Sequence, residues 1–498
     1  MRIADLAGRR VAVWGCGREG RAALSALHSR LPELRPVLFC SEAELCDVPD
    51  ETPFDVVTHA PSAAELAACD VVIKSPGVSR YRGEIEAAER HGTRFTSGTA
   101  LWFAEHPRSR VIAVTGTKGK STVTALIAHL LRARGRRVAL AGNIGLPLLR
   151  LLDAPQEPDW WVIELSSFQT RDAAAVDVAV LNNVYEEHLD WHGTRERYVA
   201  DKLALAQAAR TLVYNGGQPA LCACAARHPH ALAFGGEAGW HVAAGWVRRA
   251  GQAVFDLARS PLPGAHNAVN LCAALAALEA AGEDAGAAAG AIASFRALPH
   301  RLQWLGERGG LGWIDDSIAT TPRATCEALA SLPGRAVSVL VGGFERGLDW
   351  RAFAEHVRAQ PPHAVITMGA NGPRIAALLR KAGGACRLVE TTDVEAAVAR
   401  ARELTPTGGV VQQSPGAPSF AQYHTTSAAR GAPVSPNWRG STGCNRRDRG
   451  PGHCLTAAPP APAGGTMIGI SACHGGRIMH LSTLALAMVW PHPPRPRW

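Results

Sequence analysis

Residues 111–123 read Val-Ile-Ala-Val-Thr-Gly-Thr-Lys-Gly-Lys-Ser-Thr-Val, and this stretch decides the fold. The apolar run 111–114 predicts a buried parallel strand, and the apolar spacing over 121–132 predicts a helix. The glycines between them predict a turn whose backbone N–H groups point inward. Because a helix N-terminus favours negative charge, we expect phosphate to bind at this turn.

Two side chains of the turn suit a nucleotide phosphate. Lys120 supplies a positive charge for the β- and γ-phosphates, and Ser121 supplies a hydroxyl for Mg²⁺. The match to the general phosphate-loop pattern is incomplete, because Val114 stands where that pattern has its first glycine. An ordinary glycine turn between a strand and a helix is the alternative interpretation.

Length and composition describe an ordinary globular protein. The 498 residues suffice for about three domains, and 19% charged with 47% hydrophobic residues is a typical balance. The first ten residues have no apolar signal-peptide core, and the late apolar run 481–490 is too short to cross a bilayer. We therefore expect a cytoplasmic protein without membrane insertion.

The formal charge of +9 does not indicate nucleic-acid binding. Residues 432–498 hold seven arginines and one acid, so most of the excess lies in the tail. A basic tail is not a nucleic-acid-binding fold. The twelve cysteines are scattered singly apart from Cys222 and Cys224, which favours reduced thiols over a metal site or a disulfide framework.

The first hundred residues predict a small doubly wound domain. Residues 10–20 form a strand that runs into G-x-G-x-x-G, the dinucleotide-fold pattern. The acid expected about 20 residues later is missing, so a nucleotide other than NAD is plausible. A second glycine turn, 75–77, follows the apolar run 71–74, and residues 105–109 are a candidate linker.

Polar residues follow the predicted strands of the next block. Glu164 ends the apolar run 160–164, where a carboxylate needs a cation. His188 and several acids follow the strand predicted at 178–182, and Lys202 lies in the next helix. Ligands of open α/β sheets bind beyond the carboxyl ends of the strands. A solvated acidic loop and a surface lysine are the alternatives.

A third alternating block follows a long alanine-rich helix. Asn267 and Asn270 lie in the first turn of that helix, where capping would be an ordinary role. Strands are predicted at 337–341 and 364–368. Asp316 lies at a strand end, where it either binds a ligand or caps a helix.

Eight short motifs occur in the order in which one known family carries them. They are VTGTKGKST (114–122), GNIGLP (142–147), ELSSFQ (164–169), EHLD (187–190), DKL (201–203), GAHNAVN (264–270), LPHRLQ (298–303) and IDDS (314–317). On these motifs, residues 8–420 resemble the Mur ligase family. Within it the chain looks like the MurD type, which adds glutamate to UDP-N-acetylmuramoyl-L-alanine in peptidoglycan synthesis.

The resemblance implies an α/β protein of three domains. The tail has no sequence period and cannot build a core, so we expect it to be disordered or an out-of-frame product. The expected parts are an N-terminal Rossmann-like UDP-binding domain (1–105), a central P-loop ATP-binding domain with a parallel sheet (106–298), a C-terminal Rossmann-like glutamate-binding domain (299–431) and the tail (432–498).

The resemblance also implies ATP, two Mg²⁺ ions and an acyl-phosphate intermediate. One ion is expected on Ser121 and Glu164, and the second on His188 and Lys202. Lys202 is carbamylated in the family, which gives it the oxygen ligands that Mg²⁺ prefers. Lys120, His188 and Lys202 are the expected catalytic residues. The expected ATP-binding residues are Gly116, Thr117, Lys118, Gly119, Lys120, Ser121, Thr122, Asn267, Asn270, Arg301 and Asp316.

Two further sites follow from the same resemblance. UDP-N-acetylmuramoyl-L-alanine and glutamate are the expected substrates, and a monomer is the expected state. The residues expected to bind the UDP substrate are Arg18, Glu19, Gly77 and Asn143, and those expected to bind glutamate are Thr320, Arg346, Ser419 and Phe420.

Departures from the common pattern concern the isomer of glutamate. Arg346 stands where D-glutamate ligases usually have lysine, and Ile318 where many have lysine. Arginine binds a carboxylate as a planar fork, which lysine cannot do. With GTALWFAEH (98–106), ATTP (319–322) and SPGAPSF (414–420), the chain resembles the branch that adds L-glutamate and depends on a separate epimerase. Addition of D-glutamate, or a catalytically impaired nucleotide-binding homologue, is the alternative.

Two other classes fit less well. A ligase similar to folylpolyglutamate synthase would lack the N-terminal nucleotide domain that residues 10–104 predict. A Rossmann oxidoreductase would leave Lys120, Glu164 and His188 without a role.

Overall fold

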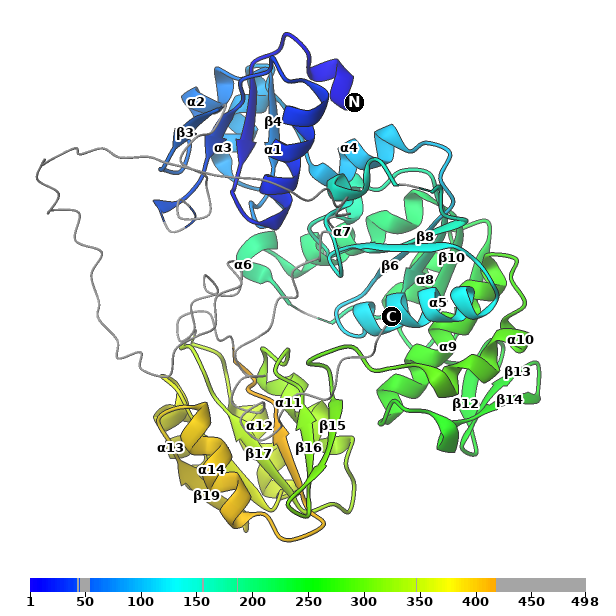
Figure 1. The fold of residues 1–498 in the computed structure, drawn as a ribbon, viewed down its shortest axis with the longest axis vertical. Coiled ribbons are helices and arrows are strands. Elements are labelled where there is room, and N and C mark those ends of the chain that lie inside the picture. The colour runs from blue at the N-terminus through cyan, green and yellow to red at the C-terminus, as the bar shows by residue number, and fades with distance from the viewer. Residues whose placement is uncertain (43, 45–53, 155, 186, 346, 418–498) are drawn as a thin grey trace, which may run out of the picture. The chain divides into compact units, whose positions relative to one another are not determined.

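The computed structural model describes residues 1–42, 44, 54–154, 156–185, 187–345 and 347–417. The chain forms two compact units. The first comprises residues 1–303 with 330–333, and the second comprises 304–329 and the chain from 334 onward (Figure 1). Arg346, Ser419, Phe420 and the tail lie outside the described residues, so the expectations made for them remain predictions.

The first unit opens with a five-stranded parallel sheet in the order β3-β2-β1-β4-β5. Its central strand β1 is buried along its whole length, because helices cover both faces (Figure 1). The elements are β1 (Val11–Trp14), α1 (Arg18–Arg30), β2 (Val37–Phe39), β3 (Asp55–Val57), α2 (Ala63–Ala67), β4 (Val71–Lys74), α3 (Gly83–Arg90), β5 (Arg94–Thr96) and α4 (Gly98–Glu105).

A second, six-stranded parallel sheet follows in the order β11-β10-β9-β6-β8-β7. A separate, small antiparallel sheet, β12-β13-β14, follows it in the sequence. The elements are β6 (Val111–Thr115), α5 (Lys120–Ala133), β7 (Val138–Gly142), β8 (Trp160–Glu164), β9 (Val176–Leu181), α6 (Leu189–His192), α7 (Arg195–Gln207), β10 (Ala209–Asn215), α8 (Pro219–Ala225), β11 (Ala231–Phe234), β12 (His241–Ala243), β13 (Trp246–Arg249), β14 (Gln252–Asp256), α9 (Ala265–Ala280) and α10 (Ala285–Ala289).

Strand β6 is the middle of this unit's packing. Ile112 and Val114 point into the core that contains α5 and α9, while Val111 and Ala113 point into the opposite core, which contains Leu205 of α7. A strand buried on both faces must be apolar at every position, which is why it reads as a continuous apolar run. The phosphate turn lies at its carboxyl end.

The second unit contains a six-stranded sheet in the order β15-β16-β20-β17-β18-β19, whose pairs from β16 to β19 are parallel. Its elements are β15 (Gln303–Arg308), β16 (Leu311–Asp315), α11 (Pro322–Ala330), β17 (Val337–Val341), α12 (Arg351–Ala359), β18 (Ala364–Thr367), α13 (Gly372–Ala382), β19 (Arg387–Glu390), α14 (Val394–Leu404) and β20 (Val410–Gln413).

The α/β class with parallel sheets is confirmed, and so are the strands predicted beside the site. The helix after the phosphate turn begins at Lys120, one residue earlier than predicted. The capping alternative for Asp316 is wrong, because α11 begins only at Pro322. Among the described helices, none combines the length and apolar character needed to cross a membrane.

A buried polar side chain, Gln412 of β20, lies in the middle of the second unit's sheet. It is fully buried, and neither its amide nitrogen nor its amide oxygen has a hydrogen-bond partner among the described residues. Residues paired with it across the sheet include Val339, which belongs to an apolar cluster.

Replacement of this glutamine should therefore stabilise the protein. Burial of an unpartnered amide costs about 1–3 kcal/mol, so Gln412→Met should raise the free energy of unfolding by about 1 kcal/mol or more. Chemical denaturation followed by the tryptophan signal measures this. Gln360→Met, at an exposed position after α12, is the matched control and should change stability by less than about 0.5 kcal/mol. Loss of stability in Gln412→Met would show that the amide has a partner.

Candidate active site

The phosphate turn depends on a left-handed glycine at its end. Gly119 has a φ of 77°, and a Cβ there would lie 2.5 Å from Asn270 Oδ1 and 2.6 Å from Asn182 Nδ2. Both contacts are shorter than real Cβ atoms show, so no other residue fits this position without movement. The turn is thus pressed directly against two asparagine side chains.

Asn182 and Asn183, which follow β9, hold the backbone of the turn. Asn183 Oδ1 accepts the N–H groups of Thr117 (3.0 Å) and Lys118 (2.8 Å). The Nδ2 atoms of Asn182 and Asn183 both donate to Lys118 O, each at 3.0 Å. The Thr117 hydroxyl bonds the Tyr198 hydroxyl at 2.6 Å. Side chains from the end of β9 and from α7 therefore hold the backbone of the turn in place.

A row of buried amides continues into the start of α9. Asn182 Nδ2 donates to Asn270 Oδ1 (2.9 Å), Asn270 Nδ2 donates to Asn267 Oδ1 (3.1 Å), and Asn267 Nδ2 donates to Pro263 O (2.7 Å). The capping alternative for Asn267 and Asn270 is wrong, because residue 264 occupies the cap and neither amide accepts from the helix backbone. The structure thus brings both asparagines to the phosphate turn.

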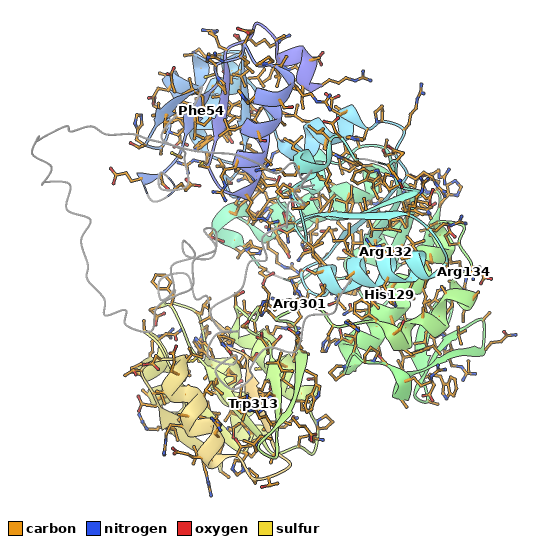
Figure 2. The ribbon with its side chains drawn as sticks, in the orientation of Figure 1. Phe54, His129, Arg132, Arg134, Arg301 and Trp313 are labelled. Atoms are coloured by element: carbon orange, nitrogen blue, oxygen red, sulfur yellow. The ribbon has the colours of Figure 1, made fainter. Side chains whose placement is uncertain are left out.

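Cations gather around the amino end of α5. Lys120 Nζ donates to Thr117 O at 3.0 Å, and an Arg301 guanidinium nitrogen donates to Ser121 Oγ at 2.8 Å. Figure 2 shows the side chain of Arg301. Lys118 pairs with Glu187 at 2.8 Å. Burial lowers the pKa of Lys120, while Glu164 opposes that shift. Such a gathering of positive charge at a helix N-terminus suits a polyphosphate.

Glu164 provides the complementary anion at the end of β8. It is 1% exposed, and its Oε1 accepts the Asn143 amide at 2.8 Å. Its Oε2 is buried and has no hydrogen-bond partner among the described residues. A buried carboxylate oxygen is costly without a partner, so a cation fits here.

The chemistry of this set fits Mg²⁺. Within the part of the chain that the structure describes, no three His, Cys, Asp or Glu side chains cluster as a metal cage. Mg²⁺ is commonly held by one or two protein oxygens, with phosphate and water completing its shell. Glu164 and the hydroxyl of Ser121 would offer such a partial set.

Lys202 is fully enclosed on α7. Its side chain is 2% exposed, Nζ donates to Gly116 O at 2.9 Å, and it lies 4.9 Å from the centre of the Tyr198 ring. Burial and the charge of Lys120 hold the pKa of Lys202 well below its usual value. Lys202 is therefore not a surface lysine, and the lowered pKa favours the neutral, nucleophilic form of its amine.

His188 lies at the start of α6 in an unusual backbone conformation. Its φ is 58°, and its ring meets Phe168 edge-on at 5.2 Å between centroids. Burial lowers the pKa of His188, which favours the neutral imidazole that metals bind. Burial would raise the pKa of the neighbouring Glu187, but Lys118 outweighs it and leaves that pKa lowered.

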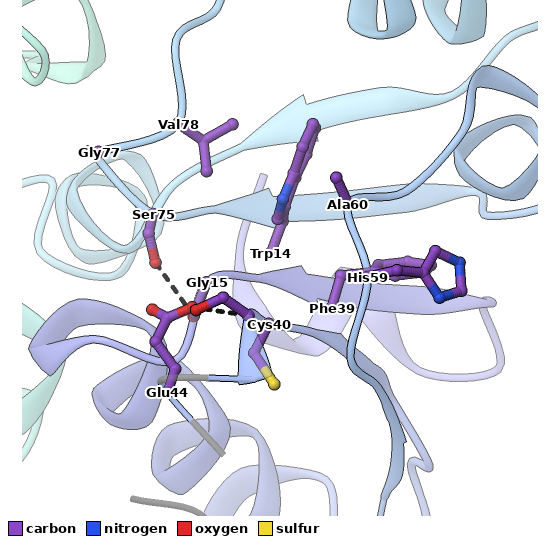
Figure 3. Close-up of a pocket in the computed structure, with 11 residues that line it drawn as sticks. Trp14, Gly15, Phe39, Cys40, Glu44, His59, Ala60, Ser75, Gly77 and Val78 are labelled. Atoms are coloured by element: carbon purple, nitrogen blue, oxygen red, sulfur yellow. Dashed lines mark hydrogen bonds between the residues drawn. The ribbon is translucent and has the colours of Figure 1, made fainter. Parts of the chain in front are cut away.

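The first sheet carries a separate cavity of about 250 Å³ at the carboxyl ends of its strands (Figure 3). Gly77 lines this cavity, and its role toward the UDP substrate remains a prediction. Arg18 is not among the lining residues and donates instead to Gly145 O, and burial raises the pKa of Glu19. The lining residues are Trp14, Gly15, Phe39, Cys40, Ser41, Glu44, His59, Ala60, Ser75, Gly77 and Val78.

Sequence reasoning missed several residues that shape these sites. Asn182 and Asn183 were passed over as the end of a strand, although two adjacent amides just after an apolar run are a signal. Trp14 and Phe39 were not assigned to the cavity, although both end strands at the edge where ligands bind. Asn143, predicted to contact the UDP substrate, bonds Glu164.

Asp316 and Thr320 belong to the second unit. Asp316 is buried, and its Oδ2 accepts the Ser414 hydroxyl at 2.7 Å. Thr320 is exposed. Their expected roles toward ATP and glutamate remain predictions.

Comparison with known proteins identifies the family. The family model described as the Mur ligase middle domain matches residues 114–278, and that described as the Mur ligase glutamate ligase domain matches 300–414. The chain belongs to the Mur ligase family. Both matched segments coincide with sheets described above.

The chain matches nearly the whole length of its curated relatives. A protein of Xanthomonas euvesicatoria pv. vesicatoria is 50% identical over 85% of this chain and 94% of its own. A protein of Micromonospora sp. is 43% identical over 85% of this chain and 95% of its own. Both are named UDP-N-acetylmuramoyl-L-alanine–L-glutamate ligase.

Solved structures share the fold of this Mur ligase. The UDP-N-acetylmuramate-alanine ligase MurC of Thermotoga maritima superposes with a TM-score of 0.54 at 18% identity, covering 82% of this chain and 96% of that one. A MurF ligase of Thermotoga maritima in complex with ADP gives 0.50 at 20% identity, covering 70% and 91%.

The contact at Gly119 generates a sharp test. Gly119→Ala should weaken binding of a non-hydrolysable ATP analogue at least about tenfold, because the new Cβ displaces the amides that hold the turn. Gly135→Ala is a matched control, since Gly135 has the same φ of 77° with open space around its Cβ position. That control should cost about 1–2 kcal/mol of stability and leave binding unchanged. Equal affinities of both variants, measured by calorimetry, would contradict the described contact.

The enclosed amine of Lys202 should oppose folding. Lys202→Met should raise the free energy of unfolding at pH 7 by more than about 1 kcal/mol in buffer depleted of CO₂, while abolishing activity.

The pH dependence of this gain has a definite sign. Below pH 10.5 the unfolded chain binds a proton that the folded amine binds weakly, so wild-type stability rises with pH and the gain of Lys202→Met shrinks. Denaturation at pH 7 and pH 9.5 measures this. Lys381→Met, at an exposed lysine of α13, is the control and should change stability by less than about 0.5 kcal/mol. A gain that grows with pH would contradict burial of the amine.

Proposed function

We propose that this Mur ligase joins L-glutamate to UDP-N-acetylmuramoyl-L-alanine with consumption of ATP, a step of peptidoglycan synthesis. The observation that carries the proposal is the meeting, at one sheet edge, of Lys120 and Arg301 with a buried Glu164 oxygen that has no hydrogen-bond partner among the residues described. Cations to bind phosphates beside an anion to bind Mg²⁺ are what phosphoryl transfer requires. The names of the relatives, at 43–50% identity, supply the substrates.

The residues would divide the work as follows. Lys120 and Arg301 neutralise charge on the transferred phosphoryl group, and the N–H groups of the turn orient it. Ser121 and Glu164 would hold one Mg²⁺. When bound, the ion screens negative charge between the phosphates and the attacking carboxylate.

Lys202 and His188 would hold a second Mg²⁺. Carbamylation of Lys202 would provide the oxygen ligands for this role: the neutral amine would attack CO₂, forming a C–N bond as one C=O π pair moves onto oxygen, and the nitrogen would release its proton to water to leave a carbamate anion. Enclosure lowers the pKa of this amine, which favours the reactive form. Burial lowers the pKa of His188, which favours the neutral imidazole with a ring nitrogen for the metal.

The cavity of the first sheet is proposed to hold the nucleotide end of the UDP substrate. Trp14 and Phe39 offer ring surfaces to a base. Gly77 has no side chain, so the backbone there can approach the ligand closely. Activation of the terminal alanine carboxylate as an acyl phosphate, followed by attack of the glutamate amine, completes the proposed reaction. We further propose a cytoplasmic monomer that acts before a separate epimerase.

Phosphate release by the purified chain tests the proposal. With ATP, Mg²⁺ and UDP-N-acetylmuramoyl-L-alanine, L-glutamate should support release at least about tenfold better than D-glutamate. Lys120→Met should lower kcat by about 100-fold or more, because a charge aimed at the transition state is lost. Lys381→Met is the exposed-lysine control and should retain full activity. Preference for D-glutamate would contradict the proposal that L-glutamate is the substrate. Absence of phosphate release with both isomers would indicate a catalytically impaired homologue.

A further inference from the structure

The loop after β4, residues 75–81, is bonded to the second sheet's helices. Trp191 Nε1 donates to Pro76 O at 2.9 Å, and Ser79 Oγ donates to Trp191 O at 2.5 Å. The Tyr81 hydroxyl lies 2.8 Å and 2.9 Å from the two carboxylate oxygens of Asp201. None of these contacts is used by the proposed reaction. We call this set of residues the latch: Pro76, Ser79, Tyr81, Trp191 and Asp201.

Asp201 is the charged centre of the latch. It is 1% exposed, it accepts from Arg171, and its Oδ2 lies 2.7 Å from His192 Nδ1. His192 is itself fully buried, with Nε2 3.0 Å from Ser167 Oγ. A buried carboxylate that is met by this many partners fixes their relative positions, because each lost bond would leave a buried polar group unpaired.

The two helices of the latch are those that carry the candidate metal residues. Lys202 is adjacent to Asp201 on α7, and successive helical residues point about 100° apart. One turn of helix thus directs Asp201 to the first sheet's loop and Lys202 to Gly116 of the phosphate turn. On α6, Trp191 lies one turn beyond His188. Trp191 and Asp201 thus lie on the same short helical segments as the candidate ligands His188 and Lys202.

The other end of the latch is the cavity of the first sheet. Ser75, Gly77 and Val78 of the loop line that cavity, and Ser75 Oγ donates to Gly15 O at 3.2 Å (Figure 3). Lys74, at the end of β4, donates to Val78 O at 3.2 Å and lies 5.6 Å from the centre of the Trp191 ring. A ligand that orders the loop from the cavity side thus orders the latch as well.

We propose that Tyr81, Trp191 and Asp201 are positioning residues that couple occupancy of the first-sheet cavity by a uridine nucleotide to binding of Mg²⁺–nucleotide at the phosphate turn. The inference rests on the proposed function for the identity of the two ligands. The coupling is reciprocal: each ligand tightens the other because both favour the latched loop.

Calorimetry with a non-hydrolysable ATP analogue and Mg²⁺, with and without UDP-N-acetylmuramoyl-L-alanine, tests the coupling. In the wild type the UDP substrate should tighten the analogue at least about fivefold. Tyr81→Phe removes only the hydroxyl and should reduce that factor at least about threefold, while the affinity for the analogue alone stays within about twofold. Trp191→Phe should act in the same way.

Tyr214→Phe, at a half-buried tyrosine of β10, is the matched control and should retain full coupling. The proposal is overturned by a wild-type factor of one, or by unchanged factors in both Tyr81→Phe and Trp191→Phe. These outcomes are distinct from failure of the proposed function. Coupled binding without glutamate transfer would reject the function and keep the latch, whereas full activity with unchanged factors in the variants would reject the latch alone.

Discussion

The hydrogen bonds from Asn182 and Asn183 to the phosphate turn are the constraint on which the site depends. They shape a backbone that a flexible glycine sequence would otherwise leave free, and they do so from a strand that is buried in both cores. Order in the turn is therefore inherited from the sheet. Because these bonds restrict the backbone of the turn, they lower the conformational entropy that ligand binding would otherwise cost.

The charged groups at the same sheet edge destabilise the folded protein but favour the binding of charged ligands. Lys120 is half-buried near the buried Lys202, and a buried Glu164 oxygen has no hydrogen-bond partner within the described part of the chain. An isolated protein would be better served by apolar residues here. The imbalance makes sense when polyphosphate and metal supply the missing charges, which is why stability and activity should diverge when one of these residues is changed.

Much of this architecture could be predicted from the sequence, and the reason is local. Strand β6, its glycine turn and α5 follow from apolar spacing and glycine alone. Asn267 lies in the first turn of α9 as predicted, whereas Asn270 lies in the second turn, because the helix begins at Ala265. The hydrogen-bond partners of these side chains could not be predicted. Nothing near Asn270 in the sequence indicates its partner Asn182, which lies 88 positions away. Asp201 was passed over for the same reason, since its partners Tyr81, Arg171 and His192 meet only through the tertiary fold.

The single oxygen of Asn183 that receives two backbone amides has a consequence for chemical ageing. Its amide nitrogen donates to Lys118 O, so Asn183 is both acceptor and donor in the turn. Deamidation to aspartate would preserve the shape and the two accepted bonds, but it would replace the donor with an anion facing a site built for phosphate. This change of one mass unit would leave the fold nearly unchanged, but the new negative charge would repel the phosphate that the turn is proposed to bind.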